Sequence, residues 1–351
     1  MKHRCLKRDV QQQTGRKDIA SVSRIARQSL RRCRKSSMGS GTQSSMLNVL
    51  KSFCSSSTLV CCPTDLIVLD GISDGQNEAP SGIALLPKDC GRINIKPTRN
   101  GPAPLGVWPW IAILYGKYPD NTEQICGGAL ISERYVLTAY QCFENSLIKW
   151  EYVTLGEYNL KTSPDCNPRE CAPPHQTIPI ERVIPHPDIK VSYPRENDLA
   201  LIRLAQRPQM YEGFVSPICL PVNPIQDMGF SVEDFEGKRS WGAGWGDTSP
   251  DTWGSMKPDI LQQVQLPIQT FQHCPKTKST FCAGGEGNDM CKGDSGNPLT
   301  LTNAAGDKVF LIGIVVGLVS NGSGDCGSIG TQSIFTSVPF YTQWIISNLE
   351  P

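Results

Sequence analysis

The sequence contains no long apolar segment and almost no imbalance of charge. No stretch of its 351 residues is apolar over the roughly 18 positions that a membrane-spanning helix requires. The formal net charge is +1, which is too small to attract nucleic acid to the surface as a whole. We therefore expect neither a membrane span nor a nucleic-acid partner.

The N-terminal segment lacks the apolar core of a secretory signal. Residues 1–35 carry twelve lysines and arginines, without the run of about 7–15 apolar residues that follows the basic part of a signal peptide. A transit peptide and a basic helix on a membrane surface are alternative interpretations. We expect residues 1–45 to be a basic segment that is disordered or wrongly assigned as the start of the chain.

Cysteine, by contrast, is abundant. Fifteen cysteines in a chain of this length indicate an oxidising compartment and a framework of disulfide bonds. We therefore expect a secreted, extracellular protein, although no signal peptide is seen in this sequence. Residues 64–99 include Cys90 and are rich in Asp, Gly, Ser and Pro up to residue 89, which predicts an exposed linker.

From residue 108 onward, short apolar runs alternate with turn residues. The runs are 111–115, 128–138, 152–155, 199–204, 261–267 and 310–316. Their lengths and the turns between them favour an antiparallel β-barrel or sandwich. Residues 339–349 have apolar residues at helical spacing instead and predict a C-terminal helix.

Three short motifs follow one another in this part of the chain. They are the segment 137–142, which ends in Gln141-Cys142, the segment 196–202 around Asp198, and the run Gly293-Asp294-Ser295-Gly296. Together they resemble the trypsin/chymotrypsin family of serine proteases, whose catalytic residues follow the order histidine, aspartate, serine. The resemblance covers about residues 90–351. It implies an all-β fold of two antiparallel barrels with a C-terminal helix, and a protease domain at 100–351.

The resemblance makes Asp198 and Ser295 remnants of a catalytic triad, with Gln141 at the histidine position. A serine hydroxyl needs a neighbouring base, and an amide has no proton-accepting pKa in the working range. In subtilisin, loss of the triad serine or histidine costs roughly 10⁶ in turnover. We do not expect any of the four histidines of the chain to replace the base; they are His3, His175, His186 and His273.

Further positions near the serine take roles from the same resemblance. Backbone N–H groups of Gly293 and Ser295 would form an oxyanion hole. Asp294 would be the aspartate that pairs with the new amino terminus of an activated zymogen, and Asn297 replaces a usual glycine.

A specificity pocket is implied by three other residues. Asp289, six residues before Ser295, would be the acidic floor that accepts Lys or Arg, with a solvated loop aspartate as the alternative interpretation. Ser333 stands in place of a usual glycine, and Leu318 at the pocket entrance is expected to crowd a long substrate side chain.

The activation segment departs from the family pattern. Activated members begin with Ile-Val-Gly-Gly after cleavage behind a basic residue, whereas the matching stretch here runs from Lys96-Pro97 to Gly101. Proline disfavours cleavage after Lys96, while Arg92–Ile93 and Arg99–Asn100 remain available. We expect that processing does not produce the usual salt bridge with Asp294.

Five disulfide pairs are implied by the resemblance. They are Cys90 with Cys219, Cys126 with Cys142, Cys166 with Cys171, Cys274 with Cys282, and Cys291 with Cys326. The pairing of the remaining cysteines stays open; these are Cys5, Cys33, Cys54, Cys61 and Cys62.

The segment 46–63, with its adjacent cysteine pair before Pro63, resembles the end of a clip domain, a small disulfide-knotted module of arthropod proteases. A coincidental pair of cysteines in a linker is the alternative. The loop closed by Cys166 and Cys171 is similar to that of clip proteases that act around prophenoloxidase activation.

No cofactor and no metal site are expected. The acidic loop around Glu157 is related to calcium-binding loops of some family members but offers few oxygen ligands. The triplet Asn321-Gly322-Ser323 is a glycosylation sequon, which is a weak signal.

Three functions remain open from the sequence. The first is a secreted, non-catalytic protease homologue that acts as a cofactor or adaptor in an extracellular cascade of the innate-immunity or melanisation type. Its partners would be other cascade proteases or their prophenoloxidase-like substrates. The second is an active trypsin-like endopeptidase, and the third is a structural or pathogen-binding protein that reuses the fold.

Overall fold

The computed structural model describes residues 82–351, except 122, 193–194, 249–256, 270–273, 276 and 321–324. The predictions for residues 1–45, for the clip-like segment 46–63 and for the linker up to residue 81 lie outside the described residues. His3, His273 and the sequon at Asn321 lie outside them as well. In the part of the chain that is described, no helix is long and apolar enough to cross a membrane.

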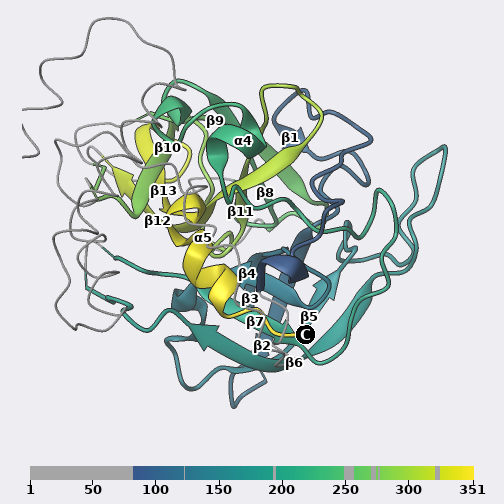
Figure 1. The fold of residues 1–351 in the computed structure, drawn as a ribbon. Helices are drawn as coiled ribbons and strands as arrows, with labels where there is room; N and C mark the ends of the chain where they lie inside the picture. The colour runs from purple at the N-terminus through teal and green to yellow at the C-terminus, as the bar shows by residue number, and fades with distance from the viewer. Residues whose placement is uncertain are drawn as a thin grey trace, which may run out of the picture. The chain divides into compact units, whose positions relative to one another are not determined.

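Six antiparallel strands close into a barrel (Figure 1). Around the barrel their order is β2-β3-β4-β7-β6-β5. Their side chains contribute to one apolar core, in which Trp110, Leu114, Leu137 and Leu201 are completely buried. The strands are β2 Ile111–Lys117, β3 Glu123–Leu130, β4 Tyr135–Thr138, β5 Lys149–Leu155, β6 Gln176–Pro185 and β7 Ala200–Leu204.

The second half of the domain is a seven-stranded antiparallel sheet in the order β1-β9-β8-β11-β12-β13-β10. With the barrel and a terminal helix, it confirms the predicted all-β fold class. The strands are β1 Gly101–Pro102, β8 Arg239–Gly244, β9 Gln262–Pro267, β10 Thr280–Glu286, β11 Pro298–Thr302, β12 Val309–Ser320 and β13 Ile329–Ser337.

One predicted run is two strands. The run 128–138 is interrupted because β3 ends at Leu130 and β4 begins at Tyr135. The turn between them is closed by the Ile131 N–H, which donates to the Tyr135 carbonyl at 2.9 Å. The hydroxyl of Ser132 also accepts a hydrogen bond from the Arg134 N–H at 3.4 Å, so local polar contacts make the hairpin.

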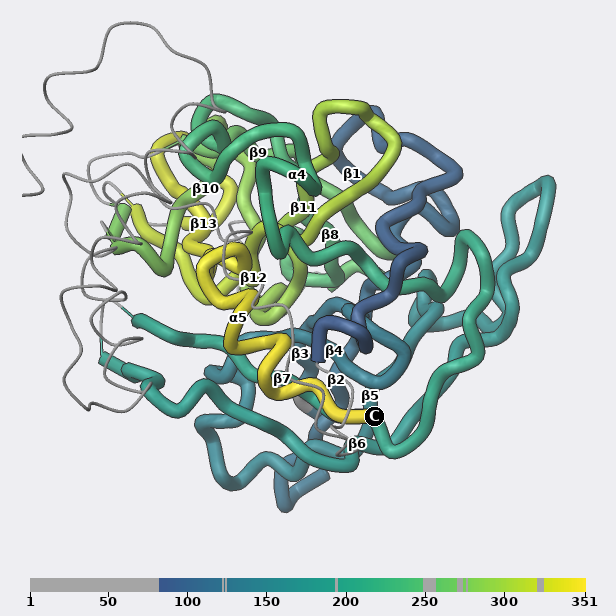
Figure 2. The backbone as a smooth tube through the Cα atoms, in the orientation of Figure 1, coloured from purple at the N-terminus to yellow at the C-terminus, as the bar shows by residue number. Residues whose placement is uncertain are grey.

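Helices are few and short among the described residues, and they are η2 Gly82–Leu85, η3 Tyr140–Phe143, α4 Pro224–Met228, η4 Glu233–Phe235 and α5 Val338–Ser347. The predicted C-terminal helix is α5, which Figure 2 shows in yellow, running from the second sheet toward the barrel. Its end is held to the barrel because the Glu350 N–H donates to the Tyr135 hydroxyl at 3.0 Å.

Five disulfides cross-link the described residues, in the same pairs that the resemblance implies. The pair Cys90–Cys219 ties the segment before the barrel to the second sheet, and backbone bonds of Gly91 with Pro217 and Val309 support it. The other pairs are Cys126–Cys142, Cys166–Cys171, Cys274–Cys282 and Cys291–Cys326.

Candidate active site

The strand register brings the three motif segments together. The end of β4 pairs with the start of β7, with Thr138 opposite Ala200. Gln141, in the helix η3 after β4, therefore lies beside Asp198, which comes two residues before β7. Ser295 lies in the loop between β10 and β11, and its carbonyl accepts a hydrogen bond from the Gly127 N–H of β3 at 2.7 Å.

Gln141 contacts both of the other residues at the site. Its backbone N–H donates to Asp198 Oδ1 at 2.9 Å. Its side-chain Nε2 donates to Ser295 Oγ at 3.1 Å. The Gln141 side chain thus places a hydrogen-bond donor, rather than a titratable group, against the serine hydroxyl.

Asp198 is completely buried, and its two oxygens differ in their surroundings. Oδ1 accepts the Gln141 N–H, whereas Oδ2 has no hydrogen-bond partner. The nearest cation to Oδ2 is Arg195, whose Nη1 lies 3.5 Å away. Burial raises the pKa of Asp198 to about 6, while the Gln141 N–H and Arg195 partly oppose this effect.

Arg195 is itself held by an acidic neighbour. Its two terminal nitrogens donate to the two carboxylate oxygens of Glu144 at 2.6 and 2.7 Å, in the bidentate geometry that arginine favours. Sequence analysis did not identify either residue. The sequence features that could have identified them are the basic residue three positions before Asp198 and the acidic residue three positions after Gln141.

The two described histidines have other neighbours. His175 Nδ1 lies 2.9 Å from Glu157 Oε2. The ring of His186 packs against Tyr341 and Trp344, with centroid distances of 5.3 and 5.0 Å. Neither of these contacts involves Ser295.

The serine loop has a backbone that requires glycine. Gly293 has φ of 100° and Gly296 has φ of 85°, which are left-handed conformations that side chains disfavour. A Cβ on Gly296 would also lie only 2.3 Å from the Gly127 carbonyl oxygen. Among the described residues, the N–H groups of Gly293 and Ser295 donate to no acceptor, so both predicted oxyanion-hole donors stay available.

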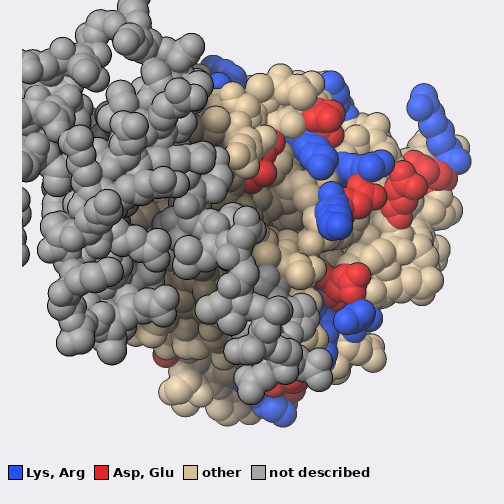
Figure 3. All heavy atoms as spheres, in the orientation of Figure 1, with Lys and Arg blue, Asp and Glu red and all other residues tan. Residues whose placement is uncertain are grey.

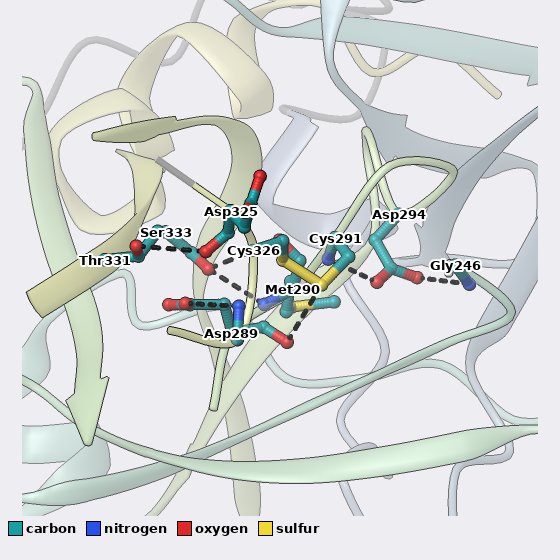
Figure 4. Close-up of a disulfide and its surroundings, with 10 residues drawn as sticks. Gly246, Asp289, Met290, Cys291, Asp294, Asp325, Cys326, Thr331 and Ser333 are labelled. Atoms are coloured by element: carbon teal, nitrogen blue, oxygen red, sulfur yellow. Dashed lines mark hydrogen bonds between the residues drawn. A yellow bond between two sulfur atoms is a disulfide. The ribbon is translucent and has the colours of Figure 1, made fainter. Parts of the chain in front are cut away.

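Two of the predicted pocket residues, Asp289 and Ser333, lie beside the disulfide Cys291–Cys326 (Figure 4). Asp289 Oδ2 accepts the Gly327 N–H at 3.0 Å, while its Oδ1 is buried without a hydrogen bond. Burial raises the pKa of Asp289 to about 7. The buried Ser333 hydroxyl accepts the Met290 N–H at 2.9 Å.

Leu318 belongs to the same wall. It pairs directly with Ser333 across β12 and β13, so their side chains share one face of the sheet. The Leu318 side chain is 37% exposed. The structure therefore joins Asp289, Ser333 and Leu318 in one region. The two wall residues, Ser333 and Leu318, both have larger side chains than glycine.

The Glu157 carboxylate has partners within the protein. One oxygen of Glu157 faces His175, and the other accepts the Tyr158 N–H at 3.0 Å. Burial raises the pKa of Glu157. Across the described ranges, no group of three or more His, Cys, Asp or Glu side chains is arranged to hold a metal ion.

Comparison with known proteins agrees with this geometry. The family model described as Trypsin matches residues 98–345. The chain belongs to the trypsin family of serine proteases. Within that family it falls among the clip-domain serine proteases and phenoloxidase-activating factors. A solved structure with the same chymotrypsin fold, the Drosophila Grass clip serine protease of the Toll pathway, has a TM-score of 0.61, 30% identity and 76% coverage of each chain.

Three curated relatives of this trypsin-family chain come from insects. Serine protease ea of Drosophila melanogaster is 34% identical over 83% of this chain and 78% of its own length. The CLIP domain-containing serine protease HP8 of Bombyx mori is 33% identical, covering 83% and 80%. Phenoloxidase-activating factor 3 of Holotrichia diomphalia is 37% identical, covering 70% of each.

Proposed function

We propose that this chain is a secreted, non-catalytic serine protease homologue that acts as a cofactor or adaptor in an extracellular proteolytic cascade of the innate-immunity or melanisation type. The observation that carries this proposal is the hydrogen bond from Gln141 Nε2 to Ser295 Oγ. Attack by serine requires a group that removes the hydroxyl proton, whereas the amide nitrogen of Gln141 donates a hydrogen bond to the hydroxyl oxygen and cannot accept its proton.

The size of the expected defect supports a loss of enzymatic function. Loss of the triad histidine costs roughly 10⁶ in turnover in subtilisin, leaving about 10³–10⁴ over water from the oxyanion hole and binding. The available N–H groups of Gly293 and Ser295 belong to that residual part. The turnover that the oxyanion hole and substrate binding give without a base is too slow for a cascade enzyme.

The relatives support the cascade and the type of partner. They include phenoloxidase-activating factors of Holotrichia diomphalia and melanization protease 1 of Drosophila melanogaster. We infer that this chain binds other cascade proteases or prophenoloxidase-like substrates. The disulfides of the described residues favour an extracellular location.

The visible charge distribution fits a protein partner better than a polyanion. On the described part of the face in Figure 3, basic and acidic side chains are interspersed. Exposed residues of opposite charge also form pairs, such as Lys161 with Asp259 and Arg239 with Glu286. Such a surface gives no extended patch of one sign on that face.

An active endopeptidase is the second candidate function. It is favoured by the presence of Asp198 and Ser295 and by the buried, unpaired oxygen of Asp289 in the pocket. The experiment that separates the two treats the chain with a trypsin-like protease, then measures fluorophosphonate labelling and hydrolysis of an arginine peptide. Wild type, Gln141→His and the labelling control Ser295→Ala are compared, with prophenoloxidase activation assayed in parallel.

We expect no labelling or hydrolysis in wild type, together with enhanced prophenoloxidase activation when an activating protease is present. Labelling of wild type that Ser295→Ala abolishes would show that the chain is catalytic. Activity only in Gln141→His would assign the defect to that residue. Failure to enhance activation, with binding to microbial surfaces instead, would favour the pathogen-binding alternative.

A further inference from the structure

The carboxylate of Asp294 is satisfied by neutral donors of the protease domain. Oδ1 accepts the Gly246 N–H at 2.9 Å and the Asn297 side-chain amide at 3.1 Å. Oδ2 accepts the Cys291 N–H at 2.9 Å. In the described part of the chain, no Lys, Arg or His side chain forms an ion pair with this buried carboxylate.

Asn297 occupies a space that two glycines provide. The residue is 2% exposed. A Cβ on Gly127 in β3 would lie 1.7 Å from Asn297 Oδ1, and one on Gly244 at the end of β8 would lie 2.2 Å from Asn297 Nδ2. The amide therefore fills the junction between the barrel and the second sheet, directly behind the serine loop.

Backbone bonds hold the residues on both sides of Asn297. The Gly127 N–H donates to the Ser295 carbonyl at 2.7 Å, and the Gly296 N–H donates to Val315 O at 3.0 Å. The Val315 N–H donates to the Asn297 carbonyl at 3.1 Å. The serine loop is thus fixed between β3, β12 and the Asp294 carboxylate.

None of these bonds comes from the segment that precedes β2. In the uncleaved chain that segment lies along the edge of the second sheet, where Gly101 of β1 pairs with Gln263 of β9. The Arg99 carbonyl accepts Gln263 Nε2 at 2.9 Å, and Asn100 Oδ1 accepts the Gln265 N–H at 2.8 Å. Asn100 Nδ2 also donates to Asn288 Oδ1 at 3.1 Å, near the start of the loop between β10 and β11. Cleavage at the exposed Arg99–Asn100 bond therefore breaks none of the hydrogen bonds of Asp294 and residues 295–297 described above.

We propose that Asn297 is an internal partner of Asp294, which gives the uncleaved chain its final serine-loop conformation without an inserted amino terminus. The amide donates to Asp294 Oδ1 and fills the space beside it, so Asp294 already has a buried internal partner in the uncleaved chain. The serine loop then reaches its final conformation before proteolysis. This inference does not depend on whether the chain is catalytic.

The first test measures hydrogen exchange in the full-length protein, before and after cleavage at Arg99–Asn100 verified by mass spectrometry. The informative amides are those of Gly246 and Cys291, because both donate to Asp294. We expect the same protection in both forms. A rise in protection of about ten-fold or more after cleavage would overturn the proposal, since it would show that the new terminus orders the loop.

A second test changes the amide itself, using Asn297→Gly and Asn297→Ala in the uncleaved chain. We expect both to lower protection of the same two amides by about ten-fold, as for a lost hydrogen bond to a carboxylate. Asn121→Gly is the matched control, because Asn121 is exposed and has φ of 66°, a conformation glycine adopts readily. Unchanged protection in a folded Asn297 variant would refute the proposed role. If neither variant folds, the cleavage comparison decides.

Discussion

At the scale of single residues, two side chains divide the contacts that one imidazole makes in a catalytic triad. Gln141 contacts the serine, because its amide donates to Ser295 Oγ. Arg195 contacts the aspartate, because its guanidinium lies 3.5 Å from the unpaired Oδ2 of Asp198. This division keeps a cation near the buried carboxylate but leaves the serine without a base.

Removing the cation should make Asp198 a weaker acid. In Arg195→Ala we expect the pKa of Asp198 to rise above its value of about 6, because the opposing charge is lost and Glu144 is no longer neutralised. Carboxyl NMR titration of the labelled aspartate measures this directly. Arg239→Ala, at the exposed pair with Glu286, is the control. An unchanged or lower pKa in Arg195→Ala would contradict the assignment of Arg195 as the compensating charge.

At the scale of elements, the apolar runs of the sequence predicted several strands, and a largely exposed strand was missed. The predicted runs correspond to β2, part of β5, β7, β9 and β12; most residues are buried in β2, β7 and β12, and half are buried in β9. The strand β6 was missed because most of its ten residues are at least partly exposed. Its position depends on pairing with β5 and β7, which a local pattern does not contain.

The pairing of β12 with β13 leads to a prediction about the pocket. Replacing Leu318 and Ser333 together by glycine should remove both side chains of this wall and widen access to Asp289, whose Oδ1 is unpaired. We expect the double variant to bind benzamidine, an arginine-like amidinium, about ten-fold more tightly than wild type at pH 8. Calorimetric titration measures the affinity. Leu147→Gly, at an exposed leucine, is the control, and equal affinity in all three proteins would show that the walls do not limit access.

At the scale of the whole molecule, the sequence predicted which residues meet but not how their charges are balanced. Motif order was enough to place Gln141, Asp198 and Ser295 in one site. The burial that raises the pKa values of Asp198, Asp289 and Asp294 depends instead on tertiary packing, which the order of the motifs does not contain. The amide of Asn297 was recognised only as a replaced glycine, because its contact with Asp294 exists only in the folded chain.

These buried acids should make the protein less stable as the pH rises. Asp289 has a pKa of about 7 when folded, against an ordinary value of 3.8, so the folded state holds a proton that the unfolded state releases. Between these pKa values, the free energy of unfolding falls with increasing pH, and the loss of stability is complete above pH 7.

The variant Asp289→Asn tests this because it removes the charge. The free energy of unfolding of the variant at pH 8 should exceed that of wild type by on the order of 1–3 kcal/mol. The difference should vanish near pH 4. Urea unfolding at both pH values measures it, with the exposed Asp307→Asn as control, and a variant less stable than wild type at pH 8 would mean that the Asp289 charge is compensated.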